Sequence, residues 1–120
     1  MPRMTPIRTA LAAVALSALA LQARADTITD WNVKVGEVMT EAKLGTPPAM
    51  RVMAIVQTAV LDAVNLAAKR QPGRAQAEAI DAAVAAANRA TMLKLMPTQE
   101  TSIQAAYTAA PSATLASAAV

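Results

Sequence analysis

The stretch from Thr46 to Lys69 constrains the fold most, because its pattern is that of a single helix of about six turns. Thr46 is a good N-cap residue, and Pro47 would take the first helical position, where a missing N–H costs nothing. The polar residues recur in steps of seven, four, three and four, which places them on one narrow polar stripe: Arg51, Thr58, Asp62, Asn65 and Lys69. Gln57 is the only polar residue between Pro47 and Lys69 that lies off this stripe.

The remaining surface of this helix is built from valine, isoleucine, leucine, methionine and alanine. A helix that is apolar over most of its circumference is normally buried. We therefore expect the helix to be covered on more than one side.

Three further helices are predicted, and with the central one they occupy residues of about 31–44, 47–69, 75–96 and 99–110. Gly45 is expected at the C′ position of the first helix, Pro97 is expected to end the third, and Thr98 to cap the fourth. The apolar face of the first helix comprises Trp31, Val35, Val38, Met39 and Ala42; the thin stripe of the third comprises Ile80, Val84, Ala87, Thr91 and Leu95. Ile103 and Tyr107 share a face of the fourth helix.

Strand signals are absent, which makes the fold class all-α. The chain has no phenylalanine and one tryptophan, and alanine contributes little buried area. A chain of this size is already marginal in the surface that it can bury. We therefore expect three to four helices that form part of an incomplete helical bundle.

Residues 1–25 have the three regions of a signal peptide: the basic residues Arg3 and Arg8, the uncharged run Thr9–Leu21, and Ala23-Arg24-Ala25 before a cut between Ala25 and Asp26. A transmembrane anchor is the alternative, but this run would span only about 20 Å of a hydrocarbon core of roughly 30 Å. We expect export to the periplasm or the exterior. Residues 26–110 then form the helical segment, and residues 111–120 a low-complexity tail.

Cleavage of this segment changes the charge balance and the classes of partner that it favours. Three of the eleven basic residues lie in the segment and none of the eight acidic residues does, so the mature chain is neutral. Neutrality and the near absence of aromatic residues exclude nucleic acid as an expected partner. The absence of cysteine excludes thiol chemistry, and the absence of histidine removes the commonest general base and metal ligand.

Two carboxylate pairs, Glu37/Glu41 and Glu78/Asp81, are each spaced about one helical turn apart. Such pairs can perform acid–base chemistry or hold a metal, but no Glu-x-x-His pattern accompanies them. A solvated face with Lys34 or Arg74 as counter-charge is the favoured interpretation. The polar stripe could likewise line a ligand cleft through Arg51, Asp62 and Asn65, although a structural role is favoured. No catalytic, cofactor-binding or metal-binding residue is assigned.

Several short motifs resemble the start of secreted vanadium-dependent haloperoxidase-like proteins, which belong with the type 2 phosphatidic acid phosphatase superfamily. They are Asp30-Trp31-Asn32, Gly36-Glu37, Pro47-Pro48-Ala49-x-Arg51-Val52 and Ala59-Val60-x-Asp62-Ala63-Val64-Asn65. The alanine-rich Asp81–Ala87 and Tyr107 are similar to a second segment of the same region. The resemblance covers roughly residues 26–110.

The resemblance implies an α-helical bundle that binds vanadate or phosphate through a lysine, two arginines and a Pro-Ser-Gly-His loop, with a second histidine at the reacting centre. All these residues lie downstream of the matched segment in the family. Pro111-Ser112 is followed by Ala113-Thr114 where glycine and histidine would be needed, and the chain has no histidine. The resemblance therefore implies a segment truncated before the catalytic motifs, with no cofactor bound in this chain.

The leading hypothesis is an exported scaffold segment of a haloperoxidase-like or acid phosphatase-like protein, inactive alone, whose partner is the missing C-terminal catalytic bundle. That bundle would pack on the Thr46–Lys69 helix. The alternative is a small periplasmic helical protein that binds a helical partner through the apolar face of the same helix. No stable membrane span is expected, and self-association is left open.

Overall fold

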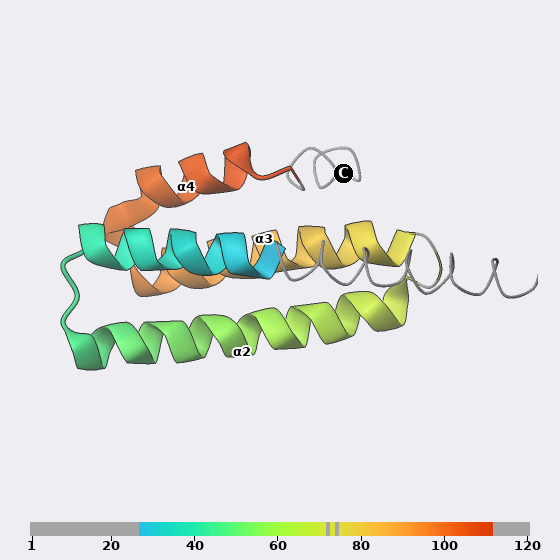
Figure 1. The fold of residues 1–120 in the computed structure, drawn as a ribbon, viewed down its shortest axis with the longest axis horizontal. Coiled ribbons are helices and arrows are strands. Elements are labelled where there is room, and N and C mark those ends of the chain that lie inside the picture. Colours follow the sequence, from blue (N-terminus) through green and yellow to red (C-terminus); the bar gives the residue numbers. More distant parts are fainter. Residues whose placement is uncertain (1–26, 72, 74, 112–120) are drawn as a thin grey trace, which may run out of the picture.

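The structure is a computed structural model that describes residues 27–71, 73 and 75–111. These residues form a helix over residues 27–41, then α2 (Thr46–Arg70), α3 (Ala75–Leu95), a 3₁₀ turn η1 (Pro97–Gln99) and α4 (Glu100–Ala109) (Figure 1). The expected all-α class is confirmed, with four helices packed together. The predicted signal peptide and residues 112–120 of the predicted tail lie outside the described residues.

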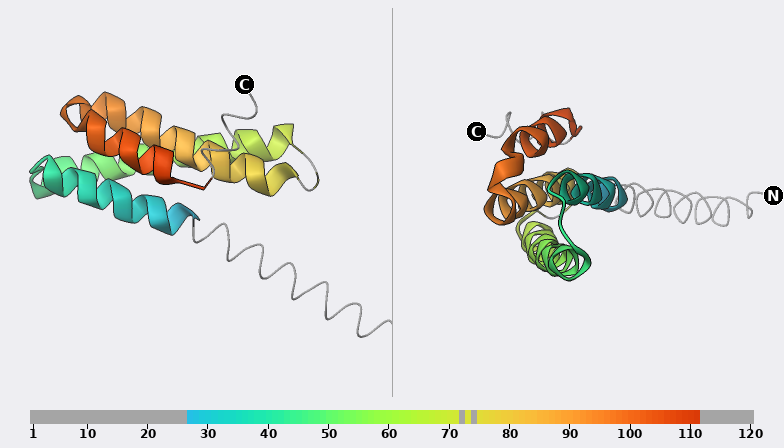
Figure 2. Two further views of the ribbon diagram at one scale, coloured as in Figure 1. Left: turned by 90° about the horizontal axis from the view of Figure 1, so that it is seen from above. Right: turned by 90° about the vertical axis from the view of Figure 1, so that its left-hand side faces the viewer.

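The four helices alternate in direction along the chain (Figure 1). The 27–41 helix and α3 lie side by side in the middle, with α2 along one side of them and α4 on the opposite side (Figure 2). Consecutive helices are joined by short connections, so each helix turns back along its predecessor. This arrangement leaves α2 and α4 on opposite outer sides of the described part of the chain.

The turn between the first two helices differs from the prediction. The 27–41 helix ends in a Schellman motif, in which the Leu44 amide donates to the Met39 carbonyl at 3.2 Å and the Lys43 amide to the Thr40 carbonyl at 3.0 Å. Lys43 therefore takes the left-handed C′ position, with φ of 56°, and the assignment of Gly45 to that position is wrong. Gly45 is instead the N-cap residue of α2, in extended conformation.

The shift has a local consequence for α2. Because Gly45 is the N-cap residue, the helix begins at Thr46, which is a helical residue and not the predicted cap. No side chain caps the helix, and Pro47 follows inside the first turn, where its missing N–H leaves no unmade bond. Thr98 is also not a cap: it lies within the 3₁₀ turn, and Gln99 is the N-cap residue of α4.

The first helix is longer at its N-terminal side than predicted, since residues 27–30 are helical. Ile28, one turn before Trp31, packs against the core and continues the apolar face of the helix. Trp31, Val35 and Val38 are buried, while Met39 and Ala42 are partly buried. The predicted apolar face of this helix is confirmed.

The buried stripe of α3 is rotated relative to the predicted one. Ile80 and Val84 are buried as predicted, but the other buried positions are Ala85, Asn88 and Met92. Ala87 and Leu95 are only partly buried. The alanines on every side of α3 give almost no hydrophobic contrast, so the pattern could not distinguish the two neighbouring stripes.

The core joins all four helices. Its largest fully buried side chains include Met92, Ile103 and Val35, and Val56 of α2 is also completely buried. Polar contacts add to the packing: Gln57 of α2 donates to Asn32, and Ser102 of α4 donates to Glu41 at 2.6 Å. The short apolar side chains of α2 and α3 therefore belong to one continuous core.

Candidate functional site

The polar stripe of α2 forms the outermost ridge of that helix. All five of its residues are exposed, and Val52, Val56 and Val60 are buried on the opposite face. Thr58 bonds only within its own helix, to the carbonyl of Ala54 at 2.9 Å. None of the stripe residues lines either of the two hollows described below. The favoured interpretation of a solvent-facing stripe agrees with these positions.

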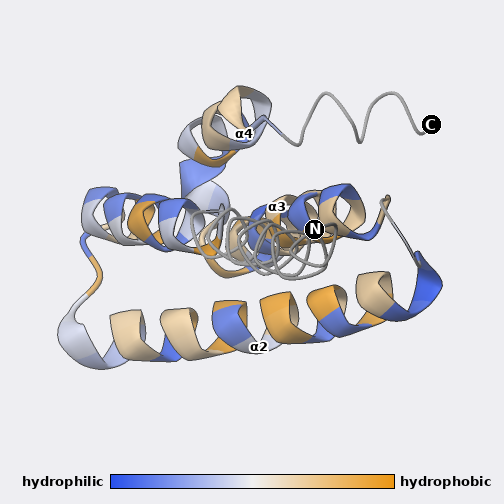
Figure 3. Ribbon diagram, turned by 45° about the vertical axis from the view of Figure 1, so that its right-hand side comes forward, coloured by the Kyte–Doolittle hydropathy of each residue, from blue (hydrophilic) through white to orange (hydrophobic). Residues whose placement is uncertain are grey.

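Exposed apolar side chains flank the stripe on both sides. On one side lie Met50 and Leu61, which are 68% and 59% exposed; on the other lie Ile55 and Leu66, which are 36% and 48% exposed. The members of each pair are eleven positions apart, which is about three turns and returns them to one side of the helix. We call these pairs the two shoulders of α2; hydrophobic and polar residues mix along the helix in Figure 3.

Each shoulder borders a different neighbour. Gln57 lies on the Met50 side of α2 and contacts Asn32, so this shoulder follows the seam with the 27–41 helix. Ile55 lines a hollow of about 200 Å³ together with four residues of α3: Ala90, Thr91, Lys94 and Leu95. Within the described residues, α2 is therefore covered on one face, and both edges of that face remain apolar and accessible.

α2 is also the one helix in the described part of the chain that is long and apolar enough to cross a membrane. Only 17% of its most apolar window is buried. The exposed polar stripe, however, runs from Arg51 to Lys69 on the outer face and carries Asp62 between them. Charges along the whole outer face would be costly in hydrocarbon, so length and composition alone carry little weight here.

The two carboxylate pairs do not converge on a common centre. Glu37 is exposed and forms an ion pair with Lys34 at 2.9 Å, as the favoured interpretation predicted. Glu41 accepts the hydrogen bond from Ser102, and Glu78 is exposed. Arg74, the expected counter-charge for Glu78 and Asp81, lies outside the described residues. No group of three or more potential ligands for a metal ion is found in the described ranges.

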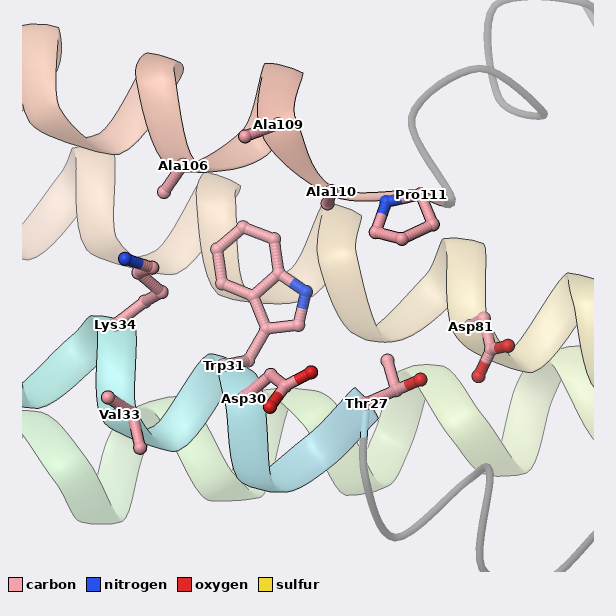
Figure 4. A pocket seen from close by; sticks show the side chains of 10 residues that line it. All are labelled: Thr27, Asp30, Trp31, Val33, Lys34, Asp81, Ala106, Ala109, Ala110 and Pro111. Atoms are coloured by element: carbon pink, nitrogen blue, oxygen red, sulfur yellow. The ribbon is translucent and has the colours of Figure 1, made fainter.

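A hollow with a volume of about 410 Å³ lies between the 27–41 helix and α4 (Figure 4). Its walls are the indole of Trp31 and three alanines of α4 and its C-terminal end, Ala106, Ala109 and Ala110. Asp30 and Asp81 supply two carboxylates to the hollow. Lys34 also lines it, at the end opposite Asp81 in Figure 4. This volume falls within the range of small-molecule sites.

Two polar residues of α3 are more buried than the sequence analysis indicates: Asp81 was assigned to a solvated face, and Asn88 was not singled out. Asn88 is 1% exposed, its Nδ2 donates to the Val84 carbonyl at 2.8 Å, and its Oδ1 has no partner among the described residues. Oδ1 of Asp81 is also buried without a described partner. The residues are seven positions apart and therefore on one stripe of α3, a phase that the alanine-rich sequence does not reveal.

No family model, curated protein or solved structure matches this chain.

Proposed function

We propose that residues 27–111 are a non-catalytic helical scaffold that packs through the shoulders of α2 against a helical body of a larger exported protein. The observation that carries the proposal is the pair of exposed apolar shoulders, Met50 with Leu61 and Ile55 with Leu66, on the longest helix of the described residues. Large apolar side chains that are exposed in groups on one helix are typical of an interaction site.

The position of the shoulders favours a partner that packs into the seams beside α2. The polar stripe occupies the outermost ridge, and covering it would require partners for Arg51, Asp62 and Lys69. A helix laid into the seam between α2 and α3 would instead contact Ile55 and Leu66 and could place a side chain in the 200 Å³ hollow. This geometry corresponds to packing one side-chain ridge into the groove between two helices.

A protein partner suits this surface better than lipid. The charged ridge would remain in water beside a helix seated in either seam, whereas a membrane around α2 would contact the whole outer face. The resemblance to vanadium haloperoxidase-like proteins supplies the proposed parent, a helical bundle of the phosphatidic acid phosphatase superfamily. Its catalytic residues and its vanadate or phosphate would belong to the partner bundle.

The parentage is tested on the DNA that follows the codon for Val120, read from a verified template. A frame that continues, directly or after a one-base shift, into Pro-Ser-Gly-His and a later histidine supports the haloperoxidase-like parent. A stop codon with no such motif in the downstream frames contradicts it. A stop codon would not decide whether the shoulders of α2 form a packing surface, which is a separate test.

The packing surface is tested with lysine pairs on α2. One variant carries Ile55→Lys and Leu66→Lys, a second carries Met50→Lys and Leu61→Lys, and the control carries Thr58→Lys and Asn65→Lys on the polar ridge. All three add two positive charges to exposed positions of one helix. Light scattering after size exclusion, over a range of concentrations, measures association.

We expect the unchanged protein and the ridge control to form polydisperse assemblies, since the shoulders lack their cover. At least one shoulder variant should become a monomer. A monomeric unchanged protein at every concentration would contradict the proposal. A single complex of fixed stoichiometry, abolished by a shoulder pair, would favour the alternative of a small periplasmic helical protein that binds its partner through this helix face.

A further inference from the structure

The hollow between the 27–41 helix and α4 combines an apolar wall with a net negative charge among its described lining residues. Trp31 and the alanines of α4 form the apolar part, and Asp30 and Asp81 are the two carboxylates. Figure 4 shows the Trp31 side chain between the 27–41 helix and α4, with Asp30 next to the backbone of Trp31. Asp81 lies on α3, farther from Trp31 than Thr27 is in this view. The carboxylates thus come from two different helices that the fold brings to one hollow.

Lys34 is the one cation among the residues that line this hollow, and its charge is already engaged. Its Nζ forms the 2.9 Å ion pair with Glu37, which is not a lining residue. Figure 4 places Lys34 and Asp81 on opposite sides of Trp31. Among the described residues that line it, the hollow therefore has two carboxylates and one cation, which is paired with Glu37.

Asp81 is partly buried beside the hollow, and one of its two carboxylate oxygens lacks a hydrogen-bond donor among the described residues. This atom, Oδ1, is buried from solvent. A buried carboxylate oxygen without a donor is costly, because it has lost its water and gained no partner. A positively charged N–H donor would satisfy both the hydrogen bond and the charge.

We propose that this hollow binds a small organic cation, namely a primary ammonium group attached to an apolar body. The ammonium donates to Asp81, with Asp30 contributing a second negative charge, and the body lies against Trp31 and the alanines of α4. A volume of about 410 Å³ suits a ligand of this size and excludes a folded partner.

Trp31 is the only tryptophan of the chain, so its fluorescence reports on this hollow directly. The experiment titrates the purified full-length protein with cyclohexylmethylammonium, and in parallel with cyclohexylmethanol and cyclohexanecarboxylate. The three probes share a ring and differ in charge. We expect a saturable change in Trp31 emission with the ammonium, and an affinity at least tenfold weaker for the alcohol and the carboxylate.

The variant Asp81→Asn keeps the shape of the side chain and removes its charge. We expect it to weaken ammonium binding about tenfold or more, and Asp30→Asn to weaken it less. Glu78→Gln is the matched control, since it removes a charge from an exposed position of α3 outside the hollow. Far-UV circular dichroism on each variant verifies that the helices are retained.

Equal binding of the alcohol and the ammonium would overturn the proposal, because it would show an apolar hollow without charge recognition. Unchanged ammonium affinity in Asp81→Asn, or no saturable response in folded protein, would overturn it as well. The proposal does not depend on the shoulders of α2. The lysine pairs on α2 should leave ammonium binding unchanged, so the two tests can fail separately.

Discussion

At the scale of single residues, Asn88 is the most informative side chain of the core. It is 1% exposed on the buried face of α3, and its Oδ1 lacks a partner in the described part of the chain. Its Nδ2 donates to the Val84 carbonyl, an acceptor already available to the helix backbone. The buried amide has therefore lost its contact with water and forms only one hydrogen bond among the described residues in exchange.

We expect Asn88→Leu to raise the free energy of unfolding by about 1 kcal/mol, because it replaces a half-satisfied buried amide by an apolar group of similar size. Chemical denaturation measures the change. Asn88→Ala is the control, since it removes the same amide but leaves a void and should not stabilise. A loss of stability in Asn88→Leu would show that Oδ1 has a partner, such as a buried water molecule.

Lys43, at the end of the first helix, also lowers the stability of the folded protein through its backbone conformation. Its φ of 56° is left-handed, a conformation that glycine adopts without the steric penalty of a Cβ atom. We expect Lys43→Gly to stabilise the protein by about 1 kcal/mol, measured as a shift in the denaturation midpoint. Lys43→Ala keeps the Cβ atom and should change stability little; equal stabilisation by both would contradict the argument from backbone conformation.

The same turn shows what local sequence signals could and could not predict. Glycine is the usual C′ residue, so Gly45 was the natural choice, but the Schellman hydrogen bonds close two residues earlier at Lys43. The helices themselves, and the apolar face of the first one, follow from periodicity alone. The stripe of α3 does not, because alanine surrounds it and only packing selects Asn88 and Met92 over Thr91 and Leu95.

The larger hollow was beyond sequence reasoning for a related reason. Asp30 and Asp81 are fifty-one positions apart and line the same hollow only because α3 lies beside the 27–41 helix. The sequence paired Asp81 with Glu78, its neighbour along the helix, whereas the structure separates them by burial. The polar stripe of α2, by contrast, needs only its own helical spacing and was predictable.

At the scale of helices, α4 contacts the 27–41 helix through Ser102 and Glu41, and it also contacts α3. Arg89 of α3 provides the link to α4: its Nε donates to Gln104 at 2.8 Å, and its guanidinium lies 4.9 Å from the ring centre of Tyr107. Ile103 inserts into the core, but α4 is only ten residues long. Short helices depend on such packing, since they are marginal alone.

We expect Arg89→Ala to speed amide hydrogen exchange in α4 about tenfold while leaving the centre of α2 little changed, because the lost contacts hold only α4. Arg89→Lys is the informative control: it keeps the charge but loses the planar group that stacks on Tyr107 and bonds Gln104. It should resemble Arg89→Ala. An equal acceleration in α2 and α4 would show that α4 opens only with the whole molecule.

At the scale of the whole molecule, one small core has to order four helices. Half of its buried members are valines, and a valine side chain buries less area than a leucine or phenylalanine side chain. The core nevertheless runs without interruption from Trp31 through Val56 to Ile103. Continuity predicts a single unfolding transition, and small size predicts a low free energy for it.

This unfolding transition is best measured in a monomeric shoulder variant, because association between molecules would distort the unfolding curve. We expect urea unfolding curves from Trp31 emission and from far-UV circular dichroism to coincide, with a free energy of about 3–5 kcal/mol. Val56→Ala should lower the free energy of unfolding by about 2 kcal/mol, because Val56 is fully buried. Both midpoints should fall together, although Val56 lies on a different helix from the reporter. If Trp31 fluorescence changes at lower urea concentration than the helical signal, the region around the Trp31 hollow unfolds separately from the rest of the molecule. In that case α2 with α3 would be the stable unit onto which the first helix and α4 dock.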